Sequence, residues 1–222
     1  TAGAVAVGFL ELPPSGRVYT QSLWHWLAIP GFRAPVGLYL DALALVMTVV
    51  VAFVGLLIHL YSTEFMRDDP GYSRFFAYMN LFVASMLTLV LADNLLLLYL
   101  GWEGVGLCSY LLIGFWYEDP VNGAAAQKAF IVTRIGDTAM ALGLFLLTTS
   151  LGTLEIQPLL QRAAEKWPVG SGPAVAAAAL LLGGALGKSA QLPLQTWLPD
   201  AMAGPTPVSA LIHAATMVTA GV

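Results

Sequence analysis

The sequence predicts an all-α protein, a polytopic bundle of transmembrane helices. Of the 222 residues, 58% are apolar and only 10% are charged, whereas soluble domains carry about 25% charged residues. The apolar residues form runs long enough for helices that cross a bilayer, which need about 20 residues. Strands of a transmembrane barrel would instead alternate over about 10 residues. We expect residues 1–222 to form a single membrane domain that is truncated at both ends.

Charge and cysteine content exclude several other classes of function. The formal net charge is −4 and the sequence has no basic patch, so we expect no nucleic-acid partner. A single cysteine, Cys108, excludes an internal disulfide and a cysteine cluster for zinc or iron–sulfur. Neither a phosphate-binding loop nor a dinucleotide fingerprint occurs. We therefore expect no cofactor in this chain and a lipid bilayer as its surroundings.

The first part of the chain is short and interrupted. Residues 1–12 are apolar but too short to span, and we expect a helix that ends at Pro13-Pro14. Residues 13–35 contain proline and glycine and are expected to form a loop. We expect the aromatic side chains of this loop in the headgroup belt: Trp24, Trp26 and Phe32.

Five long apolar segments come next, separated by polar turns. Their predicted ranges are 36–60, 75–92, 94–117, 124–151 and 173–198. Asp41 lies near the start of the first, where the helix dipole favours an anion. Asp93 and Asn94 form a very tight turn, which predicts an antiparallel helical hairpin. A short amphipathic piece is expected over 159–167, and a last helix begins at Pro207 after the capping residue Thr206.

The segment 173–198 predicts a discontinuous helix with a central lysine. Residues 173–187 carry no charge and lead into Lys188. A lysine at membrane depth costs about 2.5–3.5 kcal/mol unless it is paired or hydrated. Pro193 has no N–H to donate to the carbonyl of Ser189, so we expect the backbone to leave the α-helix there. Alternatively, Lys188 lies near a helix end and snorkels to the headgroups.

A carboxylate at similar depth gives Lys188 a candidate partner. Glu103 lies near the middle of the predicted helix 94–117, so we expect an ion pair between Glu103 and Lys188 inside the bundle. Three glycines next to Glu103 would allow another helix to approach closely: Gly101, Gly104 and Gly106. Alternatively the pair is purely structural, although desolvation leaves such pairs little net stability.

Further polar side chains occur on the neighbouring helices. Arg134 and Asp137 are spaced i,i+3 and can pair on one face, whereas Lys128 is expected nearer the interface. Ser209, His213 and Thr216 form one polar stripe on the last helix. Histidine is the side chain best suited to exchange protons near neutral pH. One titratable group per helix predicts a proton relay: Glu103, Asp137, Lys188 and His213. Alternatively, His213 is only hydrogen-bonded within the bundle.

These motifs resemble a known family. The segments 101–106, 134–137, 187–193 and 200–218 are similar to the antiporter-like subunits of respiratory complex I, the proton-translocating NADH-quinone oxidoreductase, and to the subunit L (chain 5) type in particular. The resemblance implies two inverted repeats in a longer protein, of which this fragment holds most of the first. It also implies proton translocation through the Glu103–Lys188 pair, Asp137 and His213. Redox catalysis would then belong to other subunits of the complex.

Two other functions remain open. The large subunit of multisubunit sodium/proton antiporters shares the fold and the Glu/Lys pair, but it usually has a lysine near the position of Thr219. A membrane scaffold with structural buried charges is the third interpretation. If the chain is a subunit of complex I, we expect its partners to be the other membrane subunits of that complex and protons. We then expect it in a bacterial inner membrane, with the mitochondrial inner membrane as the alternative.

Overall fold

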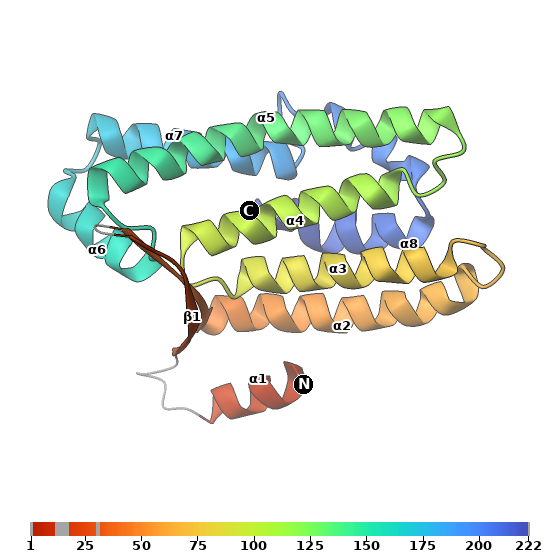
Figure 1. The fold of residues 1–222 in the computed structure, drawn as a ribbon, viewed down its shortest axis with the longest axis horizontal. Coiled ribbons are helices and arrows are strands. Elements are labelled where there is room, and N and C mark those ends of the chain that lie inside the picture. Colours follow the sequence, from red (N-terminus) through yellow and green to blue (C-terminus); the bar gives the residue numbers. More distant parts are fainter. Residues whose placement is uncertain (1, 12–17, 30–31, 222) are drawn as a thin grey trace.

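The computed structural model describes residues 2–11, 18–29 and 32–221. Four helices are long and apolar enough to cross a membrane within this described part: α2 (Ala42–Phe65), α3 (Tyr72–Val90), α4 (Leu95–Ile113) and α5 (Pro120–Leu151). Figure 1 shows them with their axes running in similar directions. Helix α3 packs between α2 and α4, and α5 packs against α4 on one side and α7 (Gly172–Lys188) on another. The predicted transmembrane helix bundle is confirmed.

Side-chain caps fix where three of these helices begin. Asp41 accepts a hydrogen bond from the backbone N–H of Ala44 at 2.8 Å and starts α2. Asn94 accepts from Leu97 at 2.8 Å and starts α4. Asp119 starts α5 with Pro120 at the first position. The predicted tight turn between α3 and α4 is confirmed, because α3 ends at Val90 and α4 begins at Leu95.

The core lies along α3 and α4. One face of α3 is fully buried and packs on α4: Phe75, Met79, Phe82 and Met86. A side chain at Gly101 would collide with the backbone of Leu89, and one at Gly104 would collide with the side chain of Ser85. These two glycines therefore allow α3 and α4 to approach closely, as predicted.

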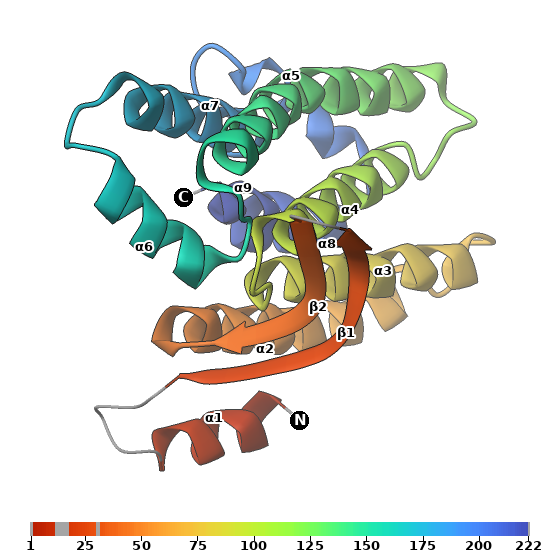
Figure 2. The ribbon, with the colours of Figure 1, turned by 60° about the vertical axis from the view of Figure 1, so that its left-hand side comes forward.

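The N-terminal region departs from the prediction. Helix α1 (Ala2–Leu10) is present, and Pro13-Pro14 lies outside the described residues. The expected loop contains instead an antiparallel hairpin of β1 (Tyr19–Ile29) and β2 (Phe32–Leu40), which crosses one end of the bundle (Figure 2). Helix α2 consequently begins at Ala42, later than predicted.

The sequence held a signal for this hairpin. Pro30-Gly31, a turn dipeptide, separates two runs rich in aromatic and aliphatic residues. The hairpin is fixed to the bundle by the backbone, because Tyr39 donates its N–H to the carbonyl of Leu91 at 2.8 Å. Trp24 and Trp26 are exposed on β1, and their expected place in the headgroup belt stays a prediction. The side chain of Phe32 lies outside the described part.

The C-terminal part consists of shorter helical pieces. The amphipathic helix α6 (Ile156–Lys166) leads into α7, which ends at Lys188. Two short 3₁₀ turns come next, η2 (Gln195–Trp197) and η3 (Asp200–Ala203). The last segment is continuous but changes type, from α8 (Thr206–Val208) through the π-helix η4 (Ser209–Thr216) to α9 (Met217–Ala220).

The predicted departure from α-helix between Ser189 and Pro193 is confirmed, since both residues lie in turns after α7. The chain after these turns does not form a second α-helical half up to residue 198, because η2 and irregular backbone fill that stretch. Figure 1 shows α7 running beside only part of the longer α5. Lys188 therefore lies at the end of a short helix that stops inside the bundle.

Candidate functional site

The end of α7 is fixed by its own backbone. Ala190 adopts a left-handed conformation with φ 49°. The N–H of Gln191 then donates a hydrogen bond to the carbonyl of Leu186 at 3.0 Å, and the N–H of Ala190 donates one to the carbonyl of Gly187 at 3.4 Å. This is the hydrogen-bond pattern of a Schellman motif, with alanine where glycine is usual. The last turn of the helix, which carries Lys188, is held in one place.

Two glycines bring the end of α7 against the middle of α5. A side chain at Gly136 would lie 2.8 Å from the carbonyl oxygen of Gly183 and 3.0 Å from the Cα of Gly187. The two helix backbones are therefore in contact there. Asp137 follows Gly136 and Lys188 follows Gly187, so the contact places these two charged residues side by side.

Lys188 is completely buried and pairs with Asp137. Its Nζ lies 3.2 Å from Oδ2 of Asp137, and the exposed fractions of the two side chains are 0% and 1%. The other carboxylate oxygen accepts a hydrogen bond from the indole N–H of Trp102 at 2.6 Å. The ammonium also lies 5.8 Å from the centre of the Trp102 ring. A side chain at Gly106 would collide with Nζ, so this glycine leaves the space that the ammonium occupies.

The predicted ion pair between Glu103 and Lys188 is wrong. Glu103 pairs with Arg134 of α5, whose Nε lies 3.7 Å from Oδ2 of Asp137. The expected pairing of Arg134 with Asp137 is thus confirmed. The reason is the rotation of α4: Trp102 and Gly106 share the face that meets Lys188, whereas Glu103 is one residue further round and faces Arg134. Arg134 therefore lies between two carboxylates.

His213 lies in the π-helix η4 and is almost fully buried. Its Nε2 is 3.2 Å from the hydroxyl oxygen of Ser109 on α4. Its Nδ1 is buried and has no hydrogen-bond partner among the described residues. The ring of Trp197 meets the imidazole edge-on at 5.7 Å between centres, and the indole N–H donates to the carbonyl of Gly187 at 3.1 Å. Trp197 thus connects the last turn of α7 with His213.

The predicted polar stripe on the last helix is divided by the π-helix. Thr216 donates its hydroxyl to the carbonyl of Leu211 at 2.7 Å, within its own segment. Ser209 is only partly buried. His213 reaches a polar side chain of another helix, Ser109 on α4. A π-helix adds a residue to each turn, so residues spaced for an α-helix no longer share one face.

Four residues were not predicted as members of the site: Trp102, Gly106, Ser109 and Trp197. Gly106 was predicted only to allow another helix to approach closely. The first three are spaced i, i+4 and i+7, which places them on one face of α4. That face contacts Asp137 through Trp102, Lys188 through Gly106 and His213 through Ser109. The spacing is visible in the sequence, but these three residues carry no charge that would mark them as a site. Trp197 had no sequence signal beyond its place after Pro193.

The remaining charges nearby are at the margin of the site. Lys128 pairs with Asp200 at 2.6 Å, and both side chains are 44% exposed, as expected of an interfacial lysine. Pro193 is exposed in the turn after Lys188. Within the described ranges, no three histidine, cysteine, aspartate or glutamate side chains gather as a candidate metal site.

The arrangement is suited to proton transfer. Two carboxylates and two cations form a cluster of zero net formal charge: Glu103, Arg134, Asp137 and Lys188. Lysine can release its proton, whereas arginine cannot. Desolvation disfavours the charged ammonium and the attraction of Asp137 favours it, so the protonation state of Lys188 depends on how closely Asp137 is held.

Comparison with known proteins places the chain in a family. Residues 92–222 match the family described as "NADH:quinone oxidoreductase/Mrp antiporter, TM", and residues 26–76 match "NADH-Ubiquinone oxidoreductase (complex I), chain 5 N-terminus". The chain is 64% identical over 214 residues to NADH-quinone oxidoreductase subunit L of Pseudomonas aeruginosa, covering 96% of this chain and 35% of the relative. It is 63% identical to the same subunit of Escherichia coli, covering 93% of this chain and 34% of the relative.

A solved structure has the same fold. The Mrp complex from Dietzia sp. DQ12-45-1b superposes with a TM-score of 0.86 at 34% sequence identity, over 99% of this chain and 23% of that chain. Our chain spans about a third of the length of its subunit L relatives. From the match over residues 92–222, which is more than half of its length, the chain belongs to the NADH:quinone oxidoreductase/Mrp antiporter family of membrane proteins.

Proposed function

We propose that the chain is part of a proton-translocating membrane subunit of an NADH-quinone oxidoreductase. One observation supports this most strongly: a lysine without solvent exposure, inside a membrane bundle, held by the carboxylate of Asp137 at 3.2 Å. Ionisable residues at membrane depth are costly and usually belong to an ion pathway. The identity of 64% to a subunit L over almost the whole chain supports the same function.

In the proposed mechanism, Arg134 and Lys188 compete for the carboxylate of Asp137. At an effective dielectric constant of about 20, opposite charges at the separation of Lys188 and Asp137 attract by about 5 kcal/mol. Arg134 is already 3.7 Å from the same carboxylate oxygen while it pairs with Glu103. If Arg134 leaves Glu103 and moves onto Asp137, the carboxylate is neutralised and the Lys188 ammonium loses its support. Lys188 then releases a proton and becomes a neutral amine.

His213 is the proposed acceptor of that proton. Its unpartnered Nδ1 has a free lone pair in the tautomer that carries its proton on Nε2. Transfer breaks an N–H bond of Lys188 and forms one on the imidazole, directly or through water. Ser109 fixes the orientation of the ring from α4. Glu103 and Arg134 therefore form the switch, and Asp137 binds the ammonium of Lys188. Lys188 donates the proton and His213 accepts it.

The role, the partners and the location of the chain follow from this proposed function. The chain acts as a subunit of an oxidoreductase, while the redox chemistry takes place in other subunits. Its partners are the other membrane subunits, protons and lipid, and bacterial relatives support the bacterial inner membrane as its location. The segment described here corresponds to most of the first antiporter-like repeat.

A sodium/proton antiporter subunit is the second candidate, because the Mrp complex superposes on the chain. A flux measurement on the parent complex in proteoliposomes separates the two. We expect NADH-driven quinone reduction to move protons in sodium-free buffer. A requirement for sodium, or sodium flux that continues without NADH, would instead favour the antiporter. Quinone reduction without any ion flux that depends on this subunit would instead favour the third interpretation, a membrane scaffold with structural buried charges.

A further inference from the structure

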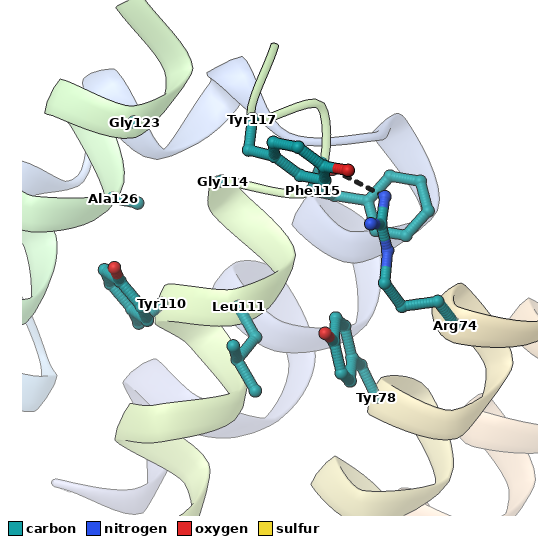
Figure 3. Close-up of a pocket in the computed structure, with 9 residues that line it drawn as sticks. All are labelled: Arg74, Tyr78, Tyr110, Leu111, Gly114, Phe115, Tyr117, Gly123 and Ala126. Atoms are coloured by element: carbon teal, nitrogen blue, oxygen red, sulfur yellow. Dashed lines mark hydrogen bonds between the residues drawn. The ribbon is translucent and has the colours of Figure 1, made fainter. Parts of the chain in front are cut away.

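A groove lies at the end of the bundle where α3 begins, α4 ends and α5 begins. It consists of a pocket of about 220 Å³, shown in Figure 3, and an adjoining space of about 570 Å³. Both parts share Arg74, Phe115 and Tyr117. The described residues that line the two parts include none of the proton-transfer site, so the groove is a separate feature of the fold.

Arg74 is held in this groove without a carboxylate partner among the described residues. Its guanidinium lies 4.7 Å from the ring centre of Phe115 and 4.8 Å from that of Tyr117. One nitrogen donates to the carbonyl of Phe115 at 3.1 Å, as the dashed line in Figure 3 marks. Its Nε is buried without a hydrogen-bond partner in the described part. The rings fix the guanidinium as a cation with unused donors.

Two further tyrosines line the smaller pocket. Tyr78 of α3 and Tyr110 of α4 line it, and Figure 3 shows Tyr78 below Arg74 and Tyr110 across the pocket. Of the described residues, no acidic side chain lines this pocket. A guanidinium without an ion-pair partner among the described residues offers the charge-assisted donors that bind a phosphate group.

The adjoining space has the opposite charge. Asp69, Glu118 and Asp119 line it together with Arg74. Asp69 accepts hydrogen bonds from Gly71 and Trp116, and Asp119 uses one oxygen to cap α5. Among the described residues, none of the three carboxylates forms a salt bridge. The groove therefore presents a cation where its two parts meet and carboxylates without salt bridges in its larger part.

The groove lies at headgroup level. Helices α3 and α4 have 19 residues each, which corresponds to about 28 Å and matches the hydrocarbon core of a bilayer. The groove is at their ends. Trp116 and Tyr117 are exposed beside it, as is typical of the aromatic belt at a membrane interface.

We propose that this groove binds the headgroup of a zwitterionic aminophospholipid, phosphatidylethanolamine. The phosphodiester lies against the guanidinium of Arg74, and the primary ammonium lies among the carboxylates of Glu118 and Asp119. Phosphatidylglycerol has no cation for these carboxylates. Phosphatidylcholine has a quaternary ammonium without N–H groups and cannot donate hydrogen bonds to them. The order of charges along the groove thus selects one headgroup class.

The test uses the full-length subunit in its parent complex, in nanodiscs of phosphatidylethanolamine and phosphatidylglycerol, with tightly bound lipid counted by native mass spectrometry. We expect Arg74→Gln to lower retention of phosphatidylethanolamine by about tenfold, as loss of a charged donor predicts. Arg74→Lys should keep most of it. Arg67→Gln is the matched control, because Arg67 is an exposed arginine of the preceding turn that pairs with Glu64.

The carboxylates are tested separately. Glu118→Gln combined with Asp119→Asn, which keeps a capping side chain, should remove the preference for phosphatidylethanolamine over phosphatidylglycerol. Unchanged preference in this double variant would overturn the proposed headgroup class, as would equal displacement of the lipid by inorganic phosphate. Equal lipid retention in Arg74→Gln and Arg67→Gln would overturn the site. Loss of a neighbouring subunit from Arg74→Gln, without loss of lipid, would assign the groove to a protein partner instead.

Discussion

Asp137, and not Glu103, holds the ammonium of Lys188, with Nζ 3.2 Å from Oδ2 and both side chains buried. Glu103 pairs instead with Arg134, which also contacts Asp137. The glutamate and the lysine are therefore two ends of one charge cluster rather than partners. In the proposed mechanism, a change at Glu103 would therefore reach Lys188 through the movement of Arg134.

Glu103→Gln in the parent complex should lower proton pumping by about tenfold or more while the complex still assembles, because Arg134 would then pair with Asp137 and displace Lys188. The double variant Glu103→Gln with Arg134→Gln should pump no better than Glu103→Gln alone, since each substitution removes one half of the same proposed switch. NADH-driven acidification of proteoliposomes measures both. A loss in the double variant that equals the sum of the two single losses would show that Glu103 and Arg134 act independently.

Gly106→Ala should impair pumping without removing any ionisable group. Its new methyl group would occupy the space of the Lys188 ammonium and push it away from Asp137. Gly104→Ala is the steric comparison on the same helix, since its methyl group would also collide, but with the side chain of Ser85 rather than with the Lys188 ammonium. Pumping per electron is the measurement. The assigned role of Gly106 is wrong if the two variants pump alike.

Ser109→Ala should slow proton transfer by about tenfold, because the His213 imidazole would lose the hydroxyl that orients it. Ser109→Thr retains a hydroxyl and should keep most of the activity. The ratio of protons moved to quinone reduced distinguishes this effect from a loss of electron transfer. Full coupling in Ser109→Ala would mean that Ser109 only fills space.

Gly136→Ala should destabilise the subunit by about 1–3 kcal/mol, because the added methyl group would overpack the contact between α5 and α7. Gly123 lies on the same helix, and a methyl group added there would have no neighbour within 4 Å. Gly123→Ala should therefore be neutral or stabilising by up to about 1 kcal/mol. Thermal unfolding of the complex in detergent compares them, and equal melting temperatures would contradict the close packing.

Much of the fold was predictable because a helix that crosses a bilayer has to be long and apolar. Long apolar runs and capping residues such as Asp41 and Asn94 define membrane helices almost without tertiary information. The hairpin β1–β2 was missed because a proline- and glycine-containing stretch was interpreted as a loop. Its strands are also tied to the α3–α4 turn by backbone contacts, such as Tyr39 to Leu91, which no local pattern reveals.

The charged members of the candidate site were predictable from the sequence, but their pairing was not, nor were the uncharged members such as Trp102 and Ser109. Position along a helix gives depth, so Glu103, Asp137 and Lys188 could each be identified as charges at membrane depth. Which of them meet depends on helix rotation, and here the Gly136–Gly187 contact decides it. The π-helix around His213 also shifts the faces of the last segment, and an α-helical period could not predict that shift.

In the proposed relay, Lys188 exchanges a proton rather than serving as a fixed charge. The most direct measurement compares proton pumping by the parent complex carrying Lys188→Arg and Lys188→Ala. Arginine retains the positive charge beside Asp137 but does not release a proton. We expect both variants to assemble and the arginine variant to pump as poorly as the alanine variant. Full pumping by Lys188→Arg would contradict the proton relay and leave Lys188 with only an electrostatic role.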